Sequence, residues 1–300
     1  MPRTVRTFAE LPERDPRAPM RRAVLNVLGH LAPILGRGTT VLARPRLQVL
    51  NLHHVFPDEE QGFRRLLEWL VATGHDLVAY GEGVERLRTG RLTRPSVAFT
   101  FDDGLRTCVR AAAVLEEFGT RGCFFLVTSM VGRTDPAEVA RFCAERIHMP
   151  PTEFMDWDDV GALQARGHEF GSHTHTHPVV SDTEPDGVRE ELARSRDALL
   201  ARCGGAEHFS WPYGRFRHFT PRAAAAVFEA GYATCASAER GAHVGPAPDR
   251  PEALCIRRDH AIAAWPLAHH RWFLGQAARR AAPEGNGWPE GWRVAGDPGP

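Results

Sequence analysis

The chain has 300 residues, and its 37 arginines balance 37 aspartates and glutamates to give zero net charge, since the sequence contains no lysine. This length is enough for one large domain with a full hydrophobic core and extensions, and it disfavours two equal domains. The balanced charge argues against a nucleic-acid-binding protein and against a polybasic membrane anchor. The six cysteines are scattered and form no C-x-x-C pair, which is typical of free thiols in a reducing compartment.

The first 45 residues are predicted to form an N-terminal extension. Residues 1–17 are charged and contain proline, unlike a signal peptide. Arg21 and Arg22 precede the apolar run Ala23–Leu35, but polar residues, a glycine and a proline interrupt this run, so we expect an amphipathic helix. No run approaches the roughly 18 apolar residues of a membrane span. The expected localisation is cytoplasmic, and peripheral contact with the inner membrane face is left open.

Segments of strand and helix character alternate along residues 46–280, the predicted main domain. The predicted strands are 47–55, 76–80, 97–101, 122–128, 167–171, 209–213 and 233–236, and the predicted helices are 62–73, 84–87, 108–118, 135–146, 158–166, 183–202 and 221–230. This repeated alternation favours an α/β fold with a barrel-like parallel sheet over a β-sandwich. Residues 281–300 are rich in glycine and proline and are predicted to be an irregular tail.

Two adjacent carboxylates follow one of the predicted buried strands. Asp102, Asp103 and Gly104 come directly after the apolar run Val97–Phe101, so both carboxylates are expected where the strand ends. Functional sites of α/β folds form at such strand ends. Neighbouring carboxylates repel each other unless a cation or hydrogen bonds offset their charge. Taken alone, an Asp-Asp-Gly sequence is more often a solvated turn.

A cluster of histidines follows another predicted strand. His173, His175 and His177 lie within five residues, and neutral imidazole is a common ligand of first-row metals. On a helical turn His173 and His177 share a face and His175 points away, whereas on an extended strand all three share one face. Two of these imidazoles with Asp103 would leave open positions for water and substrate on a metal ion. The histidines alone fit a polar loop equally well, but together with the aspartates they favour a metal site.

Three separated motifs in this chain resemble those of the polysaccharide deacetylases, the family with the NodB-type homology domain. The motifs are residues 100–104, 173–177 and 211–214, and they occur in the family order with fitting gaps. The resemblance extends over about residues 47–259, so residues 46–280 are the expected catalytic domain. It implies a distorted (β/α) barrel of about seven parallel strands, flanked by the helical extension and the irregular tail.

The resemblance also implies a reaction and residues for it. Asp103, His173 and His177 would hold one divalent metal ion, with Zn²⁺ favoured and Co²⁺ or Ni²⁺ also suited to these ligands. Asp102 would act as the base that takes a proton from water, and the backbone N–H of Tyr213 would stabilise the tetrahedral oxyanion. The expected reaction removes N-acetyl groups from an amino-sugar glycan or saccharide precursor.

This chain departs from the family pattern at two positions. In well-known members the third motif begins with an arginine, whereas Ser210 stands there in this chain. Arg257 or Arg258 from another strand is the expected replacement, and Arg257 is assigned to the catalytic set. The last motif, Leu-x-His, has no clean match. His260 is the candidate general acid, and His53 is the second candidate.

Several aromatic residues are candidates for binding the substrate. Trp157 and Trp211 are more often core residues, but flat aromatic side chains pack on sugar faces in glycan sites. Both are therefore assigned, with Pro212 and Tyr213, to the substrate and oxyanion region. The histidine pair at residues 269–270 is interpreted as a helix surface.

Two alternative functions remain open from the sequence. The same site would serve an amidase that acts on a small non-peptide amide, because the motifs determine the chemistry and not the acceptor. A degenerate member that binds a glycan without turnover would explain Ser210 and the missing last motif. The expected partner is an N-acetylated saccharide, and the sequence does not determine the oligomeric state.

Overall fold

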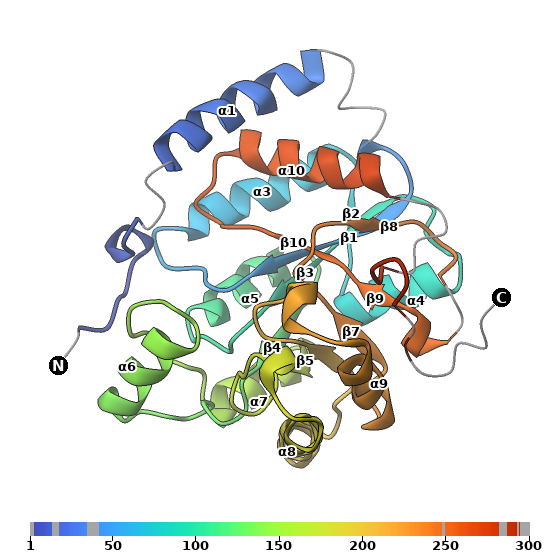
Figure 1. The fold of residues 1–300 in the computed structure, drawn as a ribbon. Helices are drawn as coiled ribbons and strands as arrows, with labels where there is room; N and C mark the ends of the chain where they lie inside the picture. The colour runs from blue at the N-terminus through green and yellow to red at the C-terminus, as the bar shows by residue number, and fades with distance from the viewer. Residues whose placement is uncertain are drawn as a thin grey trace.

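A rolled and mostly parallel sheet forms the centre of the molecule, and helices surround it (Figure 1). The structure is a computed structural model that describes residues 3–13, 18–34, 42–247, 250–281, 287–292 and 294. The main path of the sheet is β10 (Arg258–His260), β1 (Arg46–Leu52), β3 (Pro95–Phe101), β4 (Gly122–Leu126), β5 (Glu169–Ser172), β6 (His208–Ser210), β7 (Thr234–Ala236) and β9 (Cys255–Ile256). Outside this path, β2 (Asp76–Leu77) pairs with β3 and β8 (Ala242–His243) pairs antiparallel with β1.

One interrupted strand closes the sheet. β9 pairs with β7 and β10 pairs with β1, and only Arg257 separates β9 from β10 in the sequence. The strands of the main path therefore form a nearly closed barrel in which β9 and β10 together occupy one position. This arrangement confirms the predicted distorted (β/α) barrel with about seven parallel strands.

The helices around the barrel pack their apolar faces on the sheet. In α3 (Glu60–Ala72), Phe63, Leu66, Leu67 and Leu70 recur at helical spacing and are all buried, each contributing roughly 1.5–3 kcal/mol of transfer free energy. The other helices of this layer are α4 (Tyr80–Arg88), α5 (Cys108–Glu117), α6 (Pro136–Glu145), α7 (Trp157–Ala165), α8 (Pro185–Cys203) and α9 (Pro221–Glu229). All seven predicted helices are thus confirmed. The strand predicted at 76–80 is shorter, because α4 already begins at Tyr80.

The strands at the centre of the barrel are covered on both sides. Every residue of β1 and β3 is buried, as expected when packed side chains fill the barrel and helices cover its outer surface. The polar residues Asn51 and Thr100 of these strands are therefore inside the protein. Because buried polar groups require partners, these two residues indicate a polar network at the ends of the strands.

The N-terminal extension contains the expected helix. This helix, α1 (Ala18–Ile34), lies along α10 (Leu267–Arg280), as Figure 1 shows. The two helices approach closely at Gly29, where an added Cβ would lie 2.1 Å from the carbonyl oxygen of Ala268. Among the described residues, no helix is both long and apolar enough to cross a bilayer.

Two expectations about the C-terminal part need comment. His269 and His270 of α10 are buried, 1% and 2% exposed, so the interpretation of this pair as a helix surface is wrong. Much of the predicted tail lies outside the described residues. Within the described part of the tail, Trp288 is buried and its ring stacks on that of Trp211 at 6.2 Å. The division into residues 1–45, 46–280 and 281–300 stays a prediction.

Candidate active site

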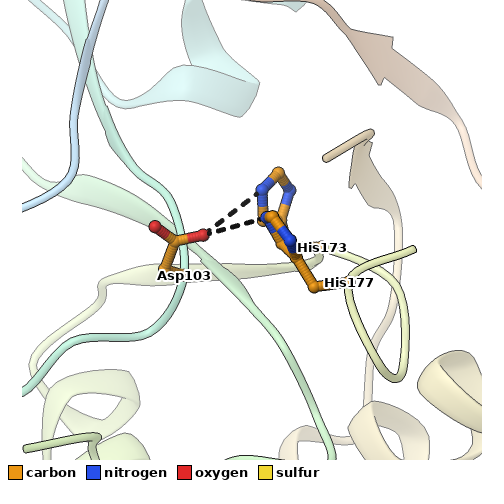
Figure 2. Close-up of side chains that lie close together, drawn as sticks. All are labelled: Asp103, His173 and His177. Carbon is orange, nitrogen blue, oxygen red and sulfur yellow. Dashed lines mark ion pairs between the residues drawn. The ribbon is translucent and has the colours of Figure 1, made fainter. Parts of the chain in front are cut away.

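Three side chains converge at the carboxyl ends of β3 and β5. Asp103 follows β3, and His173 and His177 follow β5 (Figure 2). The Oδ1 atom of Asp103 lies 3.5 Å from Nε2 of His173 and 3.4 Å from Nε2 of His177. One ligand atom from each residue falls within 4.8 Å of the other two, and all three residues are buried. The structure therefore brings together the three predicted metal ligands.

The chemistry of these donor atoms fits a divalent cation. Nδ1 of His173 donates to the carbonyl oxygen of Ser210 at 2.8 Å, which leaves the lone pair on Nε2 directed at Asp103. Burial lowers the pKa of His173 to about 4, so the imidazole is neutral, as a ligand must be. Burial raises the pKa of Asp103, but the adjacent His177 outweighs this effect and the net pKa is lowered. Asp103 Oδ1 is buried and accepts no hydrogen bond from any described residue.

The loop after β5 sets the direction of each histidine. Glu191 of α8 accepts hydrogen bonds from the backbone N–H groups of His175 and Thr176, at 2.8 and 2.7 Å. Thr174 accepts one from the N–H of His177 at 3.0 Å. Nδ1 of His175 lies 2.9 Å from the hydroxyl of Thr128, and this ring does not join the cluster. Residues 173–177 form neither a helical turn nor an extended strand, but His175 points away from the other two histidines, as expected for the helical turn.

The carboxylate of Asp102 is held by an ion pair and hydrogen bonds with other residues of the chain. Nη1 of Arg258 donates to Oδ1 of Asp102 at 2.8 Å, and Nη2 donates to Oδ2 at 2.9 Å, so the ion pair is bidentate and buried. Asn51 also donates to Oδ2 at 2.9 Å. Burial raises the pKa of Asp102, but the Arg258 charge and its hydrogen bonds prevail and lower it well below the usual range. Asp102 is therefore ionised, and Oδ1 accepts fewer hydrogen bonds than Oδ2.

The arginine beside Asp102 is Arg258 and not Arg257. Arg258 also donates to the hydroxyl of Ser210, the residue at the position of the motif arginine. The guanidinium of Arg257 instead donates to the carbonyl oxygen of Gly287 at 2.7 Å and lies over the ring of Phe216. The assignment of Arg257 to the catalytic set is thus corrected: neighbouring strand residues point to opposite faces, and Arg258 has the inward position.

The cluster opens into a pocket of about 210 Å³. Its lining includes Asp102, Asp103, His53, His260 and Tyr213. The rings of His53 and His260 lie 5.4 Å apart, so both candidates for the general acid reach the pocket. Burial lowers the pKa of His260 to about 3, which keeps this imidazole neutral. The backbone N–H of Tyr213 donates to no acceptor in the described ranges, so it is available to a bound ligand.

The expected tryptophans do not line this pocket. Trp211 is fully buried and stacks on Phe219 with ring centroids 4.2 Å apart, beside the buried Pro212. Trp157 begins α7, where the guanidinium of Arg202 lies over its ring. Both belong to the packing around the barrel, because the apolar core offers the indole rings more contact than the rim of the pocket does.

Unusual backbone conformations concentrate at this site. The described non-glycine residues with positive φ are Asp103, His148, Thr174, His177 and Tyr213, with φ from 52° to 72°. All except Thr174 line the pocket. L-residues adopt this region at an energetic cost, and the cost persists where surrounding contacts hold the chain for a function. This backbone therefore marks the site independently of its motifs.

Two participants in the site were missed from the sequence. Asn51 was not identified, although a polar residue inside the apolar run of β1 is a usable signal. Glu191 was also missed, because it lies on α8, far from the histidines in sequence, and resembles any other charged helix residue.

The comparisons with known proteins agree with one another. Residues 89–234 match the family model described as polysaccharide deacetylase. A chitooligosaccharide deacetylase from Rhizobium leguminosarum bv. phaseoli is 29% identical over 126 residues, which cover 40% of this chain and 45% of the relative. One from Bradyrhizobium sp. (strain ANU 289) is 30% identical over 123 residues, covering 40% and 46%. The chain thus spans less than half the length of the curated relatives it matches.

The fold is also found among solved structures. The structure of IcaB from Ammonifex degensii superposes with a TM-score of 0.60 at 23% sequence identity, covering 77% of this chain and 98% of that chain. At this identity the likeness shows a shared fold.

Proposed function

We propose that the chain is a metal-dependent hydrolase that removes N-acetyl groups from an amino-sugar glycan or saccharide precursor. The match of residues 89–234 to the polysaccharide deacetylase family model supports this proposal. The observation that carries this proposal is that two adjacent carboxylates have different hydrogen-bond and charge partners. Asp102 is held by Arg258, whereas the neighbouring Asp103 faces the imidazoles of His173 and His177. One carboxylate is thus suited to take a proton, and the other is suited to bind a cation.

The proposed roles follow from the atoms available at the site. Asp103, His173 and His177 would hold a divalent ion, which when bound polarises the acetamide carbonyl and acidifies a water molecule. Oδ1 of Asp102 would take the proton from the attacking water molecule, while Arg258 fixes the carboxylate in position. Zinc is the favoured ion, because zinc sites with two imidazoles and a carboxylate recur in hydrolases.

The remaining steps involve the opposite side of the pocket. The N–H of Tyr213 donates a hydrogen bond to the oxyanion as the acetamide carbon becomes tetrahedral. His260 is the proposed acid that gives a proton to the leaving amine, and His53 beside it is the alternative. Because burial keeps His260 neutral, it would act as the acid only after receiving the proton that Asp102 takes from water. Acetate and a free amino sugar leave the site. The Arg258 contact supports turnover over the degenerate alternative, because it supplies the arginine whose loss at Ser210 motivated that alternative.

The test is acetate release from a panel of N-acetylated saccharides, with and without a chelator. We expect activity that disappears with chelator and returns on adding Zn²⁺ or Co²⁺. Asp102→Asn should reduce kcat by about 100- to 10,000-fold while leaving the metal content unchanged. Asp158→Asn, at an exposed position of α7, is the matched control and should behave as the wild type. Full activity of Asp102→Asn would overturn the assigned base.

A further inference from the structure

The rim of the pocket is cationic. Arg146, His148 and Arg215 line its outer part, and the only acidic residues of the described lining are Asp102 and Asp103. Arg258 already balances the charge of Asp102, and Asp103 belongs to the proposed cation cluster. The described lining therefore contains no other acidic residue that could balance Arg146 or Arg215.

The two arginines of the rim differ in whether they form an ion pair within the protein. Arg215 forms an ion pair with Glu239, with Nη1 3.0 Å from the carboxylate oxygen. The guanidinium of Arg146, in contrast, forms no hydrogen bond or ion pair with any residue in the described ranges, and it is exposed to solvent. Arg146 thus presents an uncompensated positive charge at the mouth of the pocket.

The backbone holds this part of the rim in a defined place. Arg146 follows α6, and its N–H donates to the carbonyl oxygen of Phe142 at 2.9 Å. His148 adopts a φ of 52°, and the N–H of Met149 donates back to Cys143 at 2.9 Å. The turn that follows α6 is therefore closed by its own hydrogen bonds, which limits the motion of the rim.

Neighbouring rings connect the rim of the pocket to the cluster of Asp103, His173 and His177. The ring of His177 lies 4.9 Å from the ring of Tyr213, which lies 6.0 Å from the ring of His148. A group bound beside His148 and Arg146 would therefore belong to the sugar that carries the acetamide or to the next sugar. Since Trp157 and Trp211 do not line the pocket, Tyr213 is the one Phe, Tyr or Trp side chain in the described lining.

We propose that the substrate is an anionic acetamido saccharide, and that Arg146, with His148 beside it, binds a carboxylate or phosphate on the reacting sugar or its neighbour. This proposal rests on the deacetylase function above. A guanidinium forms charge-assisted, often bidentate hydrogen bonds with either anion, so the shared chemistry is recognition of a planar or tetrahedral oxyanion. Charge at the rim also attracts such a substrate from solution, more strongly at low ionic strength.

The experiment compares matched neutral and anionic substrates. One arm uses chitotetraose with four N-acetylglucosamine units against a hyaluronan tetrasaccharide, and the other uses N-acetylglucosamine against its 6-phosphate. We expect a higher kcat/KM for at least one anionic member, by about fivefold or more, and a difference that shrinks as NaCl is added. The two arms distinguish a carboxylate from a phosphate.

Variants assign the preference to one side chain. Arg146→Gln should bring the anionic-to-neutral ratio of kcat/KM close to one, mainly through KM, and Arg146→Lys should restore part of it. Arg141→Gln, at an exposed arginine of α6 that does not line the pocket, is the control and should keep the ratio. A ratio near one in the wild type, or equal ratios in the two glutamine variants, would overturn the proposal.

Binding measurements separate this proposal from the proposed function. Calorimetric titration of the same saccharides into Asp102→Asn gives their dissociation constants without turnover. If no saccharide releases acetate from the wild type, yet the anionic ones bind more tightly and Arg146→Gln abolishes this, then the reaction is wrong and the anion site stands. If acetate is released and charge has no effect on binding or rate, the reverse holds.

Discussion

The two halves of the site differ in whether other residues of the chain provide hydrogen-bond partners for their buried polar atoms. On the side of β3 and β10, Asp102 receives hydrogen bonds from Arg258 and Asn51, and both carboxylate oxygens have partners. In the cluster of Asp103, His173 and His177, Asp103 Oδ1 and His177 Nδ1 are buried and have no partner in the described part of the chain. The first half is complete as folded, whereas the second leaves Asp103 Oδ1 for a ligand to satisfy.

The largest expected effect comes from breaking the incomplete half. His177→Ala removes a proposed ligand and should reduce the metal content of the purified protein from about one ion per chain to near zero. Activity should fall by more than about 100-fold, since removing even the partner of a ligand costs 10- to 100-fold. Elemental analysis and acetate release are the measurements. His175→Ala is the control, because this neighbour points away, and metal retention by His177→Ala would contradict the ligand set.

Substitutions in the complete half, around Asp102, should lower the free energy of unfolding. Arg258→Met leaves Asp102 buried without its cation, and we expect a loss of about 3–5 kcal/mol in the free energy of unfolding. Arg257→Met should cost about 1 kcal/mol, because it removes only a hydrogen bond and a ring contact. Denaturant unfolding of both variants tests this. Equal losses would mean that the Asp102 ion pair adds nothing to the fold.

A histidine outside the site provides a reference for pH effects. Burial lowers the pKa of His243 to about 4, and its Nε2 accepts the N–H of Arg257 at 2.8 Å. The unfolded state therefore binds more protons below pH 6.5, and the free energy of unfolding falls as pH decreases from 6.5 toward 4. The expected loss for this residue is about 2 kcal/mol between pH 7 and 5. In thermal melts, His243→Gln should show a shallower pH dependence over that range, and an unchanged slope would exclude His243 as its source.

The smallest effect should come from removing a single hydrogen bond in the complete half. Asn51→Ala removes one of the hydrogen bonds to Asp102 but leaves the bidentate ion pair intact. We expect a loss of about 1 kcal/mol in the free energy of unfolding and a modest fall in kcat. Chemical denaturation measures the first quantity and acetate release the second. A loss as large as that in Arg258→Met would show that the amide, and not the arginine, holds the carboxylate.

The same contrast explains what the sequence could predict. The convergence of Asp103 with His173 and His177 was predictable, because Asp103 directly follows the clear apolar run of β3 and the two histidines lie within one short motif. Choosing between Arg257 and Arg258 was not, because a shift of one residue reverses the face of a strand and β9 and β10 are very short.

The aromatic residues show a second limit of prediction. Trp211 belongs to a matching motif, but its ring lies in the core because Phe219 and Trp288 pack against it. The partner Trp288 lies in a segment whose composition predicts irregular structure, so this contact has no local signal. Motif membership identified the backbone at Tyr213 correctly as a part of the pocket, but it did not determine where the neighbouring side chain points.

The closure of the barrel through β10 has a consequence for synthesis of the protein. Asp102 and its partner Arg258 are 156 residues apart, and β1 obtains its second parallel neighbour only from the end of the same distant segment. Until residues 258–260 have left the ribosome, β1 in the nascent chain has an unpaired edge. The carboxylate of Asp102, which is buried in the folded protein, then lacks its partner Arg258. Long-range pairing of this kind slows folding and exposes strands to association, so the last strand of the described residues completes both the barrel and the ion pair of Asp102.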